Sequence, residues 1–198
     1  IEWTPEDGTL PSGLTARVAW SPNVGGKNAG DKTGSGVQTG DLQSGWDVTL
    51  DASSEVTGVD GLNIFGGISN VDRDQTAAAV SGNREEKTIG ATYAMGGFTF
   101  GYQISEEDTG RTGVTKYDNT AYGITFAVND DLSIGYNHVE SDEKSTTPVT
   151  AEATSYQAAY TMGGATFSIA EVDVKNRAYG TGTSADVSGT VVAMALAF

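Results

Sequence analysis

The last eleven residues, Ser188 to Phe198, constrain the fold most strongly. Large apolar side chains occupy every second position at Val192, Met194, Leu196 and Phe198, and the positions between them carry Val or Ala. A period of two is the signature of a β-strand whose faces meet different surroundings. A strand on the surface of a soluble sheet would place polar groups on its solvent face. Here one face is bulky and apolar while the other is small, which suits a strand whose outer face meets lipid.

The composition supports a membrane protein made of strands. Hydrophobic residues make up 37% of the 198 residues, and the net charge is −15, which together would suit disorder. However, the aromatic and β-branched residues fall in short alternating runs, and a barrel needs apolar groups at every second strand position alone. No apolar run reaches the ~18 residues that a membrane-spanning helix needs. The acidic composition also argues against nucleic acid as a partner, since phosphate binding needs clustered Lys and Arg.

The chain repeats one supersecondary unit. Residues 90–104 (GATYAMGGFTFGYQI) and 157–171 (QAAYTMGGATFSIAE) each predict a strand, a tight Met-Gly-Gly turn and a returning strand. Residues 122–137 repeat the unit with an Asn-Asp-Asp turn, and residues 46–69 repeat it with a longer turn near Gly58. Two glycines suit the positive φ angles of a two-residue hairpin. A further strand is predicted at 14–20, so we expect ten strands, or eleven if residues 1–3 end another one.

The alternation assigns two faces to these strands. One face collects large apolar residues, among them Trp46, Val48, Leu50, Ile64, Ile68, Phe98, Phe100, Tyr122, Ile134, Tyr156, Phe167 and Ile169. The other collects Asp, Thr, Ser, Asn and Gln. Apolar outside and polar inside predicts an all-β protein, a transmembrane antiparallel up-and-down β-barrel filled with water. A soluble sandwich that buries the apolar face is the alternative.

The predicted connections alternate in length. Those at 95–97, 129–131 and 162–164 are tight, whereas those at 71–86, 105–118, 140–152 and 174–187 are predicted as long polar loops. Tight turns on one rim and long loops on the other are typical of outer-membrane barrels, and the C-terminal Phe198 falls on the tight-turn side. Residues 72–87 are the one helical candidate, and a solvated loop is the preferred interpretation of them.

Two segments resemble the general trimeric porins of Gram-negative bacteria, particularly those of marine alphaproteobacteria. In the opening IEWTPEDGTLPSGLTARVAWSPN, an aromatic residue and a Thr-Pro turn precede the Gly-Leu pair that begins the next strand. The closing TVVAMALAF resembles the C-terminal barrel-assembly signature of such proteins, carried here by Met194, Leu196 and Phe198. The resemblance covers nearly the whole chain, although each motif is loose by itself.

The resemblance implies an architecture and partners. Residues 1–198 would be a single barrel domain that is incomplete at its N-terminal side, comprising strands six or seven to sixteen of a sixteen-stranded porin. A complete ten-stranded barrel is the alternative. The implied setting is the outer membrane of a Gram-negative bacterium. The implied partners are two further copies in a homotrimer, membrane lipid and lipopolysaccharide, and the barrel-assembly machinery, which would bind the C-terminal strand.

Candidate functional residues are polar side chains on the inward face. They are predicted to line a pore, with the charged members setting the potential that a permeating ion experiences: Arg17, Asp47, Asp51, Asn63, Gln103, Asn137 and Gln157. The alternative for Asp51 is a solvated position at the periplasmic rim.

The sequence offers little for catalysis. The single His, His138, stands near Glu140 and Asp142 without a nucleophile and base, so we expect no enzyme activity, no cofactor and no metal site. Weak cation binding to the acidic segments 70–75 and 106–108 is an open alternative.

The predicted function is therefore an outer-membrane porin. It would form a water-filled channel for passive diffusion of small hydrophilic solutes and ions, with a preference for cations drawn by acidic loops. The alternative is a structural or adhesive surface barrel whose acidic extracellular loops bind partners, lipopolysaccharide or phage.

Overall fold

The computed structural model describes residues 1–6, 8–22, 42–77, 79–113 and 116–196. These residues form one antiparallel sheet of eleven strands in which every strand pairs with its neighbours in the sequence. The strands are β1 (Glu2–Trp3), β2 (Leu14–Ser21), β3 (Leu42–Ala52), β4 (Leu62–Arg73), β5 (Arg84–Met95), β6 (Phe98–Asp108), β7 (Lys116–Ala127), β8 (Leu132–Lys144), β9 (Val149–Met162), β10 (Ala165–Lys175) and β11 (Val187–Leu196). Three short helices occupy connections: α1 (Ser54–Thr57), η1 (Arg177–Tyr179) and η2 (Thr183–Ala185).

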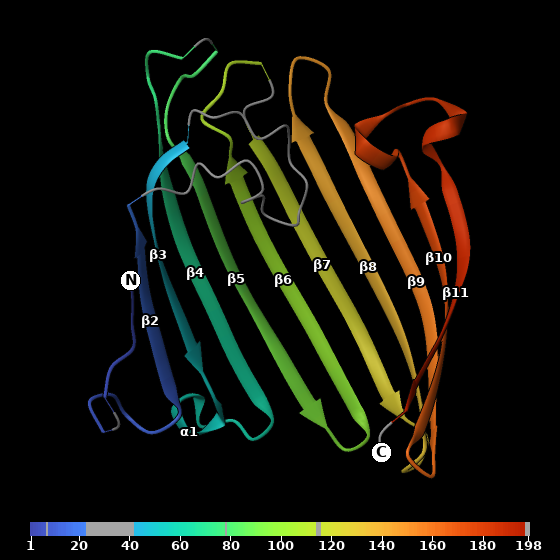
Figure 1. Ribbon diagram of the computed structural model, residues 1–198. Coiled ribbons are helices and arrows are strands. Elements are labelled where there is room, and N and C mark those ends of the chain that lie inside the picture. The colour runs from blue at the N-terminus through green and yellow to red at the C-terminus, as the bar shows by residue number, and fades with distance from the viewer. Residues whose placement is uncertain (7, 23–41, 78, 114–115, 197–198) are drawn as a thin grey trace.

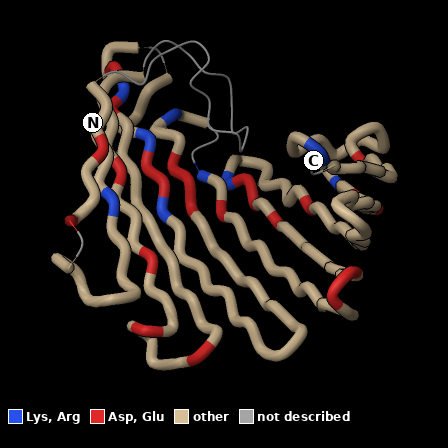
Figure 2. The backbone as a smooth tube through the Cα atoms, turned by 60° about the horizontal axis from the view of Figure 1, so that its bottom comes forward, with Lys and Arg blue, Asp and Glu red and all other residues tan. Residues whose placement is uncertain are grey.

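The sheet curls into an open trough (Figures 1 and 2). Its strands tilt in the same sense, and β1 and β11 form the two edges. The up-and-down antiparallel order predicted from the alternation is confirmed, including the eleventh strand at residues 2–3.

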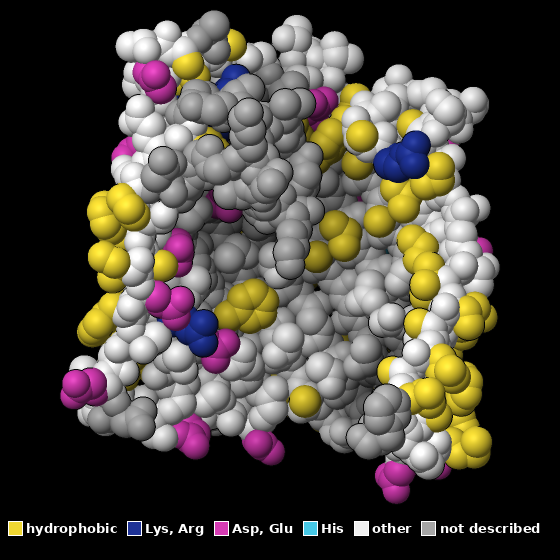
Figure 3. Space-filling view, viewed as in Figure 1, with side chains coloured by type: hydrophobic (Ala, Val, Ile, Leu, Met, Phe, Trp, Pro, Cys, Tyr) yellow, Lys and Arg dark blue, Asp and Glu magenta, His cyan; other side chains and the backbone are white. Residues whose placement is uncertain are grey.

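The register places the predicted apolar side chains on the convex face. Trp20 pairs with Trp46, Val48 with Ile68, and Phe98 with Phe126, so residues of one kind meet across the strands. In Figure 3 hydrophobic side chains gather along both outer flanks, and fewer of them are visible in the hollowed face toward the viewer. Among the described residues no large side chain is fully buried, and Val192 is 73% exposed. The apolar face therefore has no protein layer on it, which contradicts the sandwich alternative.

Connections of two kinds lie at opposite ends of the sheet. The tight turns 96–97, 128–131 and 163–164 lie at one end, the turn end, together with α1 and the end of β11. The connections 74–83, 109–115, 145–148 and 176–186 lie at the other, the loop end. The predicted parity of turns and loops is confirmed. The helix considered around residues 72–87 does not form in its described part, which consists of two strand ends and a turn-rich connection.

The predicted lengths of the loops are wrong. Strands extend into all four segments predicted as loops, and the segment 140–152 keeps only 145–148 as a connection. The charged residues of this segment stay in the ladder because their side chains bond across strands. The carboxylate of Asp142 on β8, for example, accepts a hydrogen bond at Oδ1 from Thr150 Oγ1 on β9, at 2.5 Å. The sequence also predicts a long loop, rich in Gly and Lys, over residues 22–41, and this segment lies almost wholly outside the described residues.

In the described part of the chain, no helix is both long enough and apolar enough to cross a membrane.

Candidate functional site

The concave face is the candidate functional site because it is polar and hollow. A cavity of about 540 Å³ lies against β3 to β7, and its lining includes Asp47, Thr49, Arg84, Glu86, Gln103 and Glu107. These side chains share one face by register: Asp47 stands opposite Ser69, Glu86 opposite Glu107. A concavity of this size that presents these polar side chains can hold water and small solutes.

All seven residues predicted to line a pore lie on this face. The pairings of Arg17 with Thr49, of Asn137 with Gly123 and of Gln157 with Gly135 fix their orientation. The others are fixed in the same way: Asp47, Asp51 and Asn63 on β3 and β4, and Gln103 on β6. Their role in conduction remains a prediction.

The seven residues do not form one cluster. Asp51 is the penultimate residue of β3 at the turn end, where Asn63 Nδ2 donates to Asp51 Oδ2 at 2.9 Å. Arg17 lies 3.9 Å from Glu2 across β1 and β2, and both side chains are about 60% exposed. Gln103, Asn137 and Gln157 lie on separate strands along the wall. Asp51 therefore lies at the rim of the sheet, as the alternative interpretation of this residue expected.

An ionic cluster near the loop end was missed from sequence. Arg84 on β5 contacts Glu86 (Nη2 to Oε1, 2.6 Å) and Glu107 on β6 (Nε to Oε1, 3.1 Å). Arg73 on β4 donates from Nε to the carbonyl oxygen of Thr109 at 2.7 Å. Arg73, Arg84 and Glu107 are buried. Glu107 was missed from sequence because residues 105–118 were predicted as a loop. Had the strand been extended past Ile104 with the same alternation of faces, Glu107 would have been placed on the concave wall.

A row of polar and aromatic side chains continues the wall beyond this cluster. Asn119 Nδ2 donates to Ser105 Oγ at 3.2 Å, and Ser141 Oγ donates to Asn119 Oδ1. Ser141 Oγ also lies 2.7 Å from the hydroxyl of Tyr179, which comes from η1. The Tyr179 ring contacts Tyr117, with centroids 5.0 Å apart. Burial raises the pKa of Tyr179 above its ordinary value.

Negative groups outnumber positive ones on the concave face of the described strands. The register places three arginines there: Arg17, Arg73 and Arg84. It places six carboxylates there: Glu2, Asp47, Asp51, Glu86, Glu107 and Glu143. The electrostatic potential along this wall is therefore negative on balance.

The convex face carries two bands. The apolar band runs from the turn end to a row of tyrosines, Tyr102, Tyr122, Tyr136 and Tyr156; from Phe98 to Ile104 it spans about 20 Å at 3.3 Å per residue. Tyr136 lies inside β8, because the strand continues past it toward the loop end.

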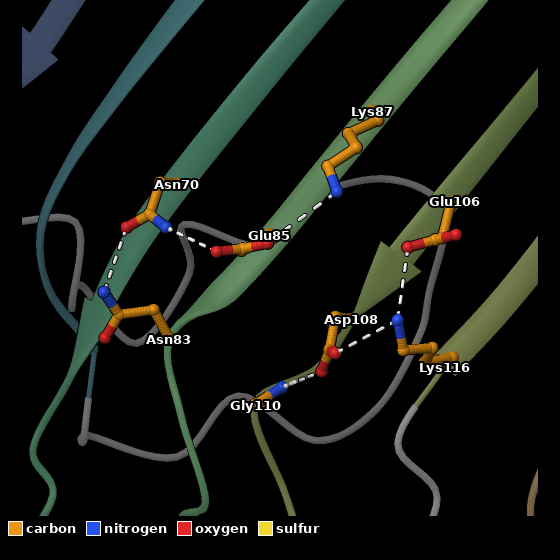
Figure 4. A network of polar contacts seen from close by, with 8 residues as sticks. All are labelled: Asn70, Asn83, Glu85, Lys87, Glu106, Asp108, Gly110 and Lys116. Atoms are coloured by element: carbon orange, nitrogen blue, oxygen red, sulfur yellow. Dashed lines mark hydrogen bonds and ion pairs between the residues drawn. The ribbon is translucent and has the colours of Figure 1, made fainter.

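Above the tyrosines lies the convex charged band, on the same face of the same strands. It comprises Glu85, Lys87, Glu106, Asp108, Lys116, Asp118, Glu140, Asp142, Lys144, Glu152, Glu171, Asp173 and Lys175. Lysines bridge neighbouring carboxylates: Lys116 Nζ lies 3.3 Å from Glu106 Oε1 and 3.6 Å from Asp108 Oδ2 (Figure 4). Lys144 bridges Asp118 and Asp142 in the same way, at 3.3 Å each. Figure 2 shows this concentration of charge toward the loop end of the strands.

The acidic segment 106–108, considered for weak cation binding, is divided between the faces. Glu106 and Asp108 point to the convex face, and Glu107 points to the concave one. Among the described residues, no group of three or more His, Cys, Asp or Glu side chains is placed to hold a metal ion. Residues 70–73 are likewise part of β4.

His138 lies on the convex face at the border of the two bands. Its Nδ1 is 2.9 Å from Thr154 Oγ1, its Nε2 is 3.1 Å from Glu140 Oε1, and its ring packs 5.0 Å from that of Tyr122. These contacts are those of a structural side chain at a polar border.

The C-terminal strand forms the edge of the apolar band. Met194 pairs with Phe167 and Leu196 with Ala165 on the convex face, as the alternation predicts. Phe198 lies outside the described residues.

The same arrangement occurs in solved structures. OmpF of Salmonella typhi, solved in complex with daunomycin, superposes with a TM-score of 0.70 at 13% identity and covers 98% of this chain. A porin refined at 1.8 Å resolution gives 0.62 at 14% identity over 98%. The chain has the porin fold. A mutant of the Rh. blastica porin gives 0.59 at 17% identity over 94%.

The porin-fold chain is shorter than these structures. It spans 60% of the OmpF chain, 60% of the refined porin and 64% of the Rh. blastica porin. No protein-family model and no curated protein sequence matches it. The identities are low, so the likeness concerns the fold, and the porin-type barrel fold expected from the sequence is confirmed.

Proposed function

We propose that the protein is an outer-membrane channel for passive diffusion of small hydrophilic solutes and ions in a Gram-negative bacterium. The observation that carries this proposal is the difference between the two faces of the sheet: the convex face carries an apolar band across all the long strands, and the concave face at the same level is polar. Lipid would cover the first and water would fill the second. A barrel that acted only through its loops would not need a hollow polar wall, so this observation favours a channel over a surface-binding barrel.

A cation preference follows from the wall charges. Carboxylates outnumber arginines on the concave face, and two of the arginines are engaged in buried contacts near the loop end. Wall charges set the potential for a permeating ion without any cofactor. The carboxylates of β3, β5 and β6 replace the acidic loops as the predicted source of this preference.

Closure of the barrel requires more strands. The backbone groups at the edges of β1 and β11 cannot stay unpaired in a bilayer. An up-and-down antiparallel barrel closes with an even number of strands, so eleven need an odd number of additional ones. Five more would give the sixteen strands that leave an aqueous channel. We therefore propose that further strands of the same protein pair with both edges, and that the closed barrels assemble as a homotrimer.

Lipopolysaccharide is the proposed partner of the convex charged band. This band adjoins the apolar band directly, at the level where lipid head groups meet water. Lysines such as Lys116 and Lys144 can contact phosphate groups, and the surrounding carboxylates can attract the divalent cations that bridge them. The C-terminal strand, with Met194 and Leu196 exposed on its convex face, is the proposed contact for the barrel-assembly machinery.

Conductance of the natively extracted protein in a planar bilayer, under a salt gradient, tests the proposed function. Stepwise openings, especially in threes, with a cation-selective reversal potential are expected. The absence of conductance from a protein whose circular dichroism shows a folded sheet would refute the channel and favour the surface-binding barrel.

A further inference from the structure

We propose that the connection between β10 and β11, residues 176–186, is an inward-folded shelf that narrows the mouth of the channel and limits the size of solutes that enter. Tyr179 is the residue that fixes this shelf. The inference rests on the channel function proposed above and adds a determinant of its specificity.

The contacts of Tyr179 show how far the shelf reaches. Its hydroxyl is 2.7 Å from Ser141 Oγ on β8, and its ring packs against Tyr117 on β7. Both partners lie on the concave face. Strands β10 and β7 are three strand spacings apart, roughly 14 Å along the sheet at about 4.8 Å each, and the connection together with the side chains of Tyr179 and Tyr117 bridges this distance on the inner wall. In Figure 1 this connection, coloured red, lies beside the loop end of β9.

The base of the shelf is fastened to the sheet. Asn176 Nδ2 donates to the carbonyl oxygen of Thr150 on β9 at 2.8 Å, and the Asn176 backbone N–H donates to Asp186 Oδ1 at 3.0 Å. The second bond joins the two ends of the connection. Ala185, within the connection, is buried. These bonds hold the shelf independently of Tyr179, so Tyr179 governs its inward position rather than its existence.

The backbone of the shelf is in an unfavourable conformation. Asn176, Ala178 and Tyr179 have φ angles of 51°, 53° and 57°, in the left-handed region that side chains with a Cβ rarely adopt. Such residues persist where the surroundings over-determine them, and they concentrate at functional sites. Here the left-handed residues turn the chain inward and deliver the Tyr179 ring to Tyr117.

The shelf restricts size and leaves the charge preference in place. Tyr179 adds no charge to the mouth, because a phenol is neutral at physiological pH and burial raises the pKa of this one further. Glu107 and Glu143, which flank Tyr117 in the register, keep the surrounding wall negative. The shelf therefore selects solutes by size, while the charges of the surrounding wall continue to favour cations at the same level of the channel.

Single cysteines test the position of the shelf, because these 198 residues contain none and an introduced thiol can be labelled. Ala178→Cys places a thiol on the shelf beside Tyr179 without removing it. Glu140→Cys places one on the convex face of β8, next to Ser141 in sequence. A bulky methanethiosulfonate reagent should lower the unit conductance roughly twofold at position 178 and leave it unchanged at 140. Unchanged current from an Ala178→Cys protein shown by mass spectrometry to be labelled would overturn the shelf.

Size exclusion tests Tyr179 itself. In liposomes, Tyr179→Ala should raise the entry rate of a trisaccharide relative to a monosaccharide by about twofold, while Tyr179→Phe, which keeps the ring contact, should stay close to the parent protein. A merely structural role would change stability without changing this ratio, and an unchanged ratio would overturn the assignment. If the unlabelled parent protein gave no current at all, both the proposed channel and the proposed shelf would be refuted. A parent protein that conducts, with variants that show no effect, would refute the shelf alone.

Discussion

Arg84 Nε lies 3.1 Å from Glu107 Oε1 on the concave wall, and their side chains are 11% and 9% exposed. Lys175 and Glu152 approach more closely, at 2.9 Å, but the lysine side chain is 67% exposed. Removing one member of a buried ion pair leaves a charge without water and without its partner, whereas an exposed charge is hydrated again. Burial therefore makes the longer contact the more important one for stability.

The first prediction concerns this difference. Arg84→Ala should lower the free energy of unfolding by about 3 kcal/mol, because Glu107 and Glu86 lose their shared guanidinium. Arg84→Lys should lower the free energy of unfolding less, since an ammonium group keeps the positive charge although it lacks the planar guanidinium that contacts two carboxylates. Guanidinium chloride titrations of the detergent-solubilised protein measure both changes. Lys175→Ala is the control and should change stability far less; an equal loss would contradict the argument from burial.

The second prediction concerns ion selectivity. Asp47→Asn removes a carboxylate in the middle of β3 on the concave wall and should lower the cation-to-anion permeability ratio, roughly twofold, in dilute salt. The shift should fade near 1 M salt, where the screening length is about 3 Å. Reversal potentials under a salt gradient measure it. Glu140→Gln makes the same change of charge on the convex face, and a shift as large as that of Asp47→Asn would show that surface charge, rather than the wall, sets selectivity.

The third prediction concerns lipopolysaccharide. Together, Lys116→Ala and Lys144→Ala should weaken its binding by roughly tenfold, because each lysine is a cation on the face that adjoins the lipid. Chelation of divalent cations should weaken binding further if carboxylates bind through bridging ions. Retention on immobilised lipopolysaccharide measures both effects. Arg17→Ala, on the concave face, is the control and should have no effect. If the double lysine variant were retained as well as the parent protein, the convex charged band would not be the contact for lipopolysaccharide.

The alternation of residue types predicted the faces of the strands well. A period of two assigns Asp47, Asn137 and Gln157 to one face wherever apolar partners mark the other, because lipid and water impose different side chains on alternate positions. The same reasoning gave the order of the strands and the end at which the tight turns lie.

The charged strand ends could not be predicted in this way. Beyond the apolar band both faces meet water, so the alternation of polar and apolar residues disappears while the ladder continues. Glu107 consequently appeared to belong to a loop with Glu106, although the two side chains point to opposite faces. The contact of Tyr179 with Ser141 joins residues 38 apart across two strands, and no local pattern encodes it.

The last prediction uses two adjacent residues on β10 to test whether the convex face meets lipid. Ile169 lies between Ala158 and Val192 on the convex face and is 50% exposed, whereas Ser168 lies between Ala159 and Ala193 on the concave face. Ile169→Lys should destabilise the protein folded in lipid vesicles by about 3 kcal/mol, because an ammonium group in the hydrocarbon layer loses its hydration. Ser168→Lys adds the same charge to a wall in contact with water and should be tolerated. Urea titrations of vesicle-folded protein compare the two; similar losses for both would mean that the two faces do not differ in solvent, and the barrel assignment would fail.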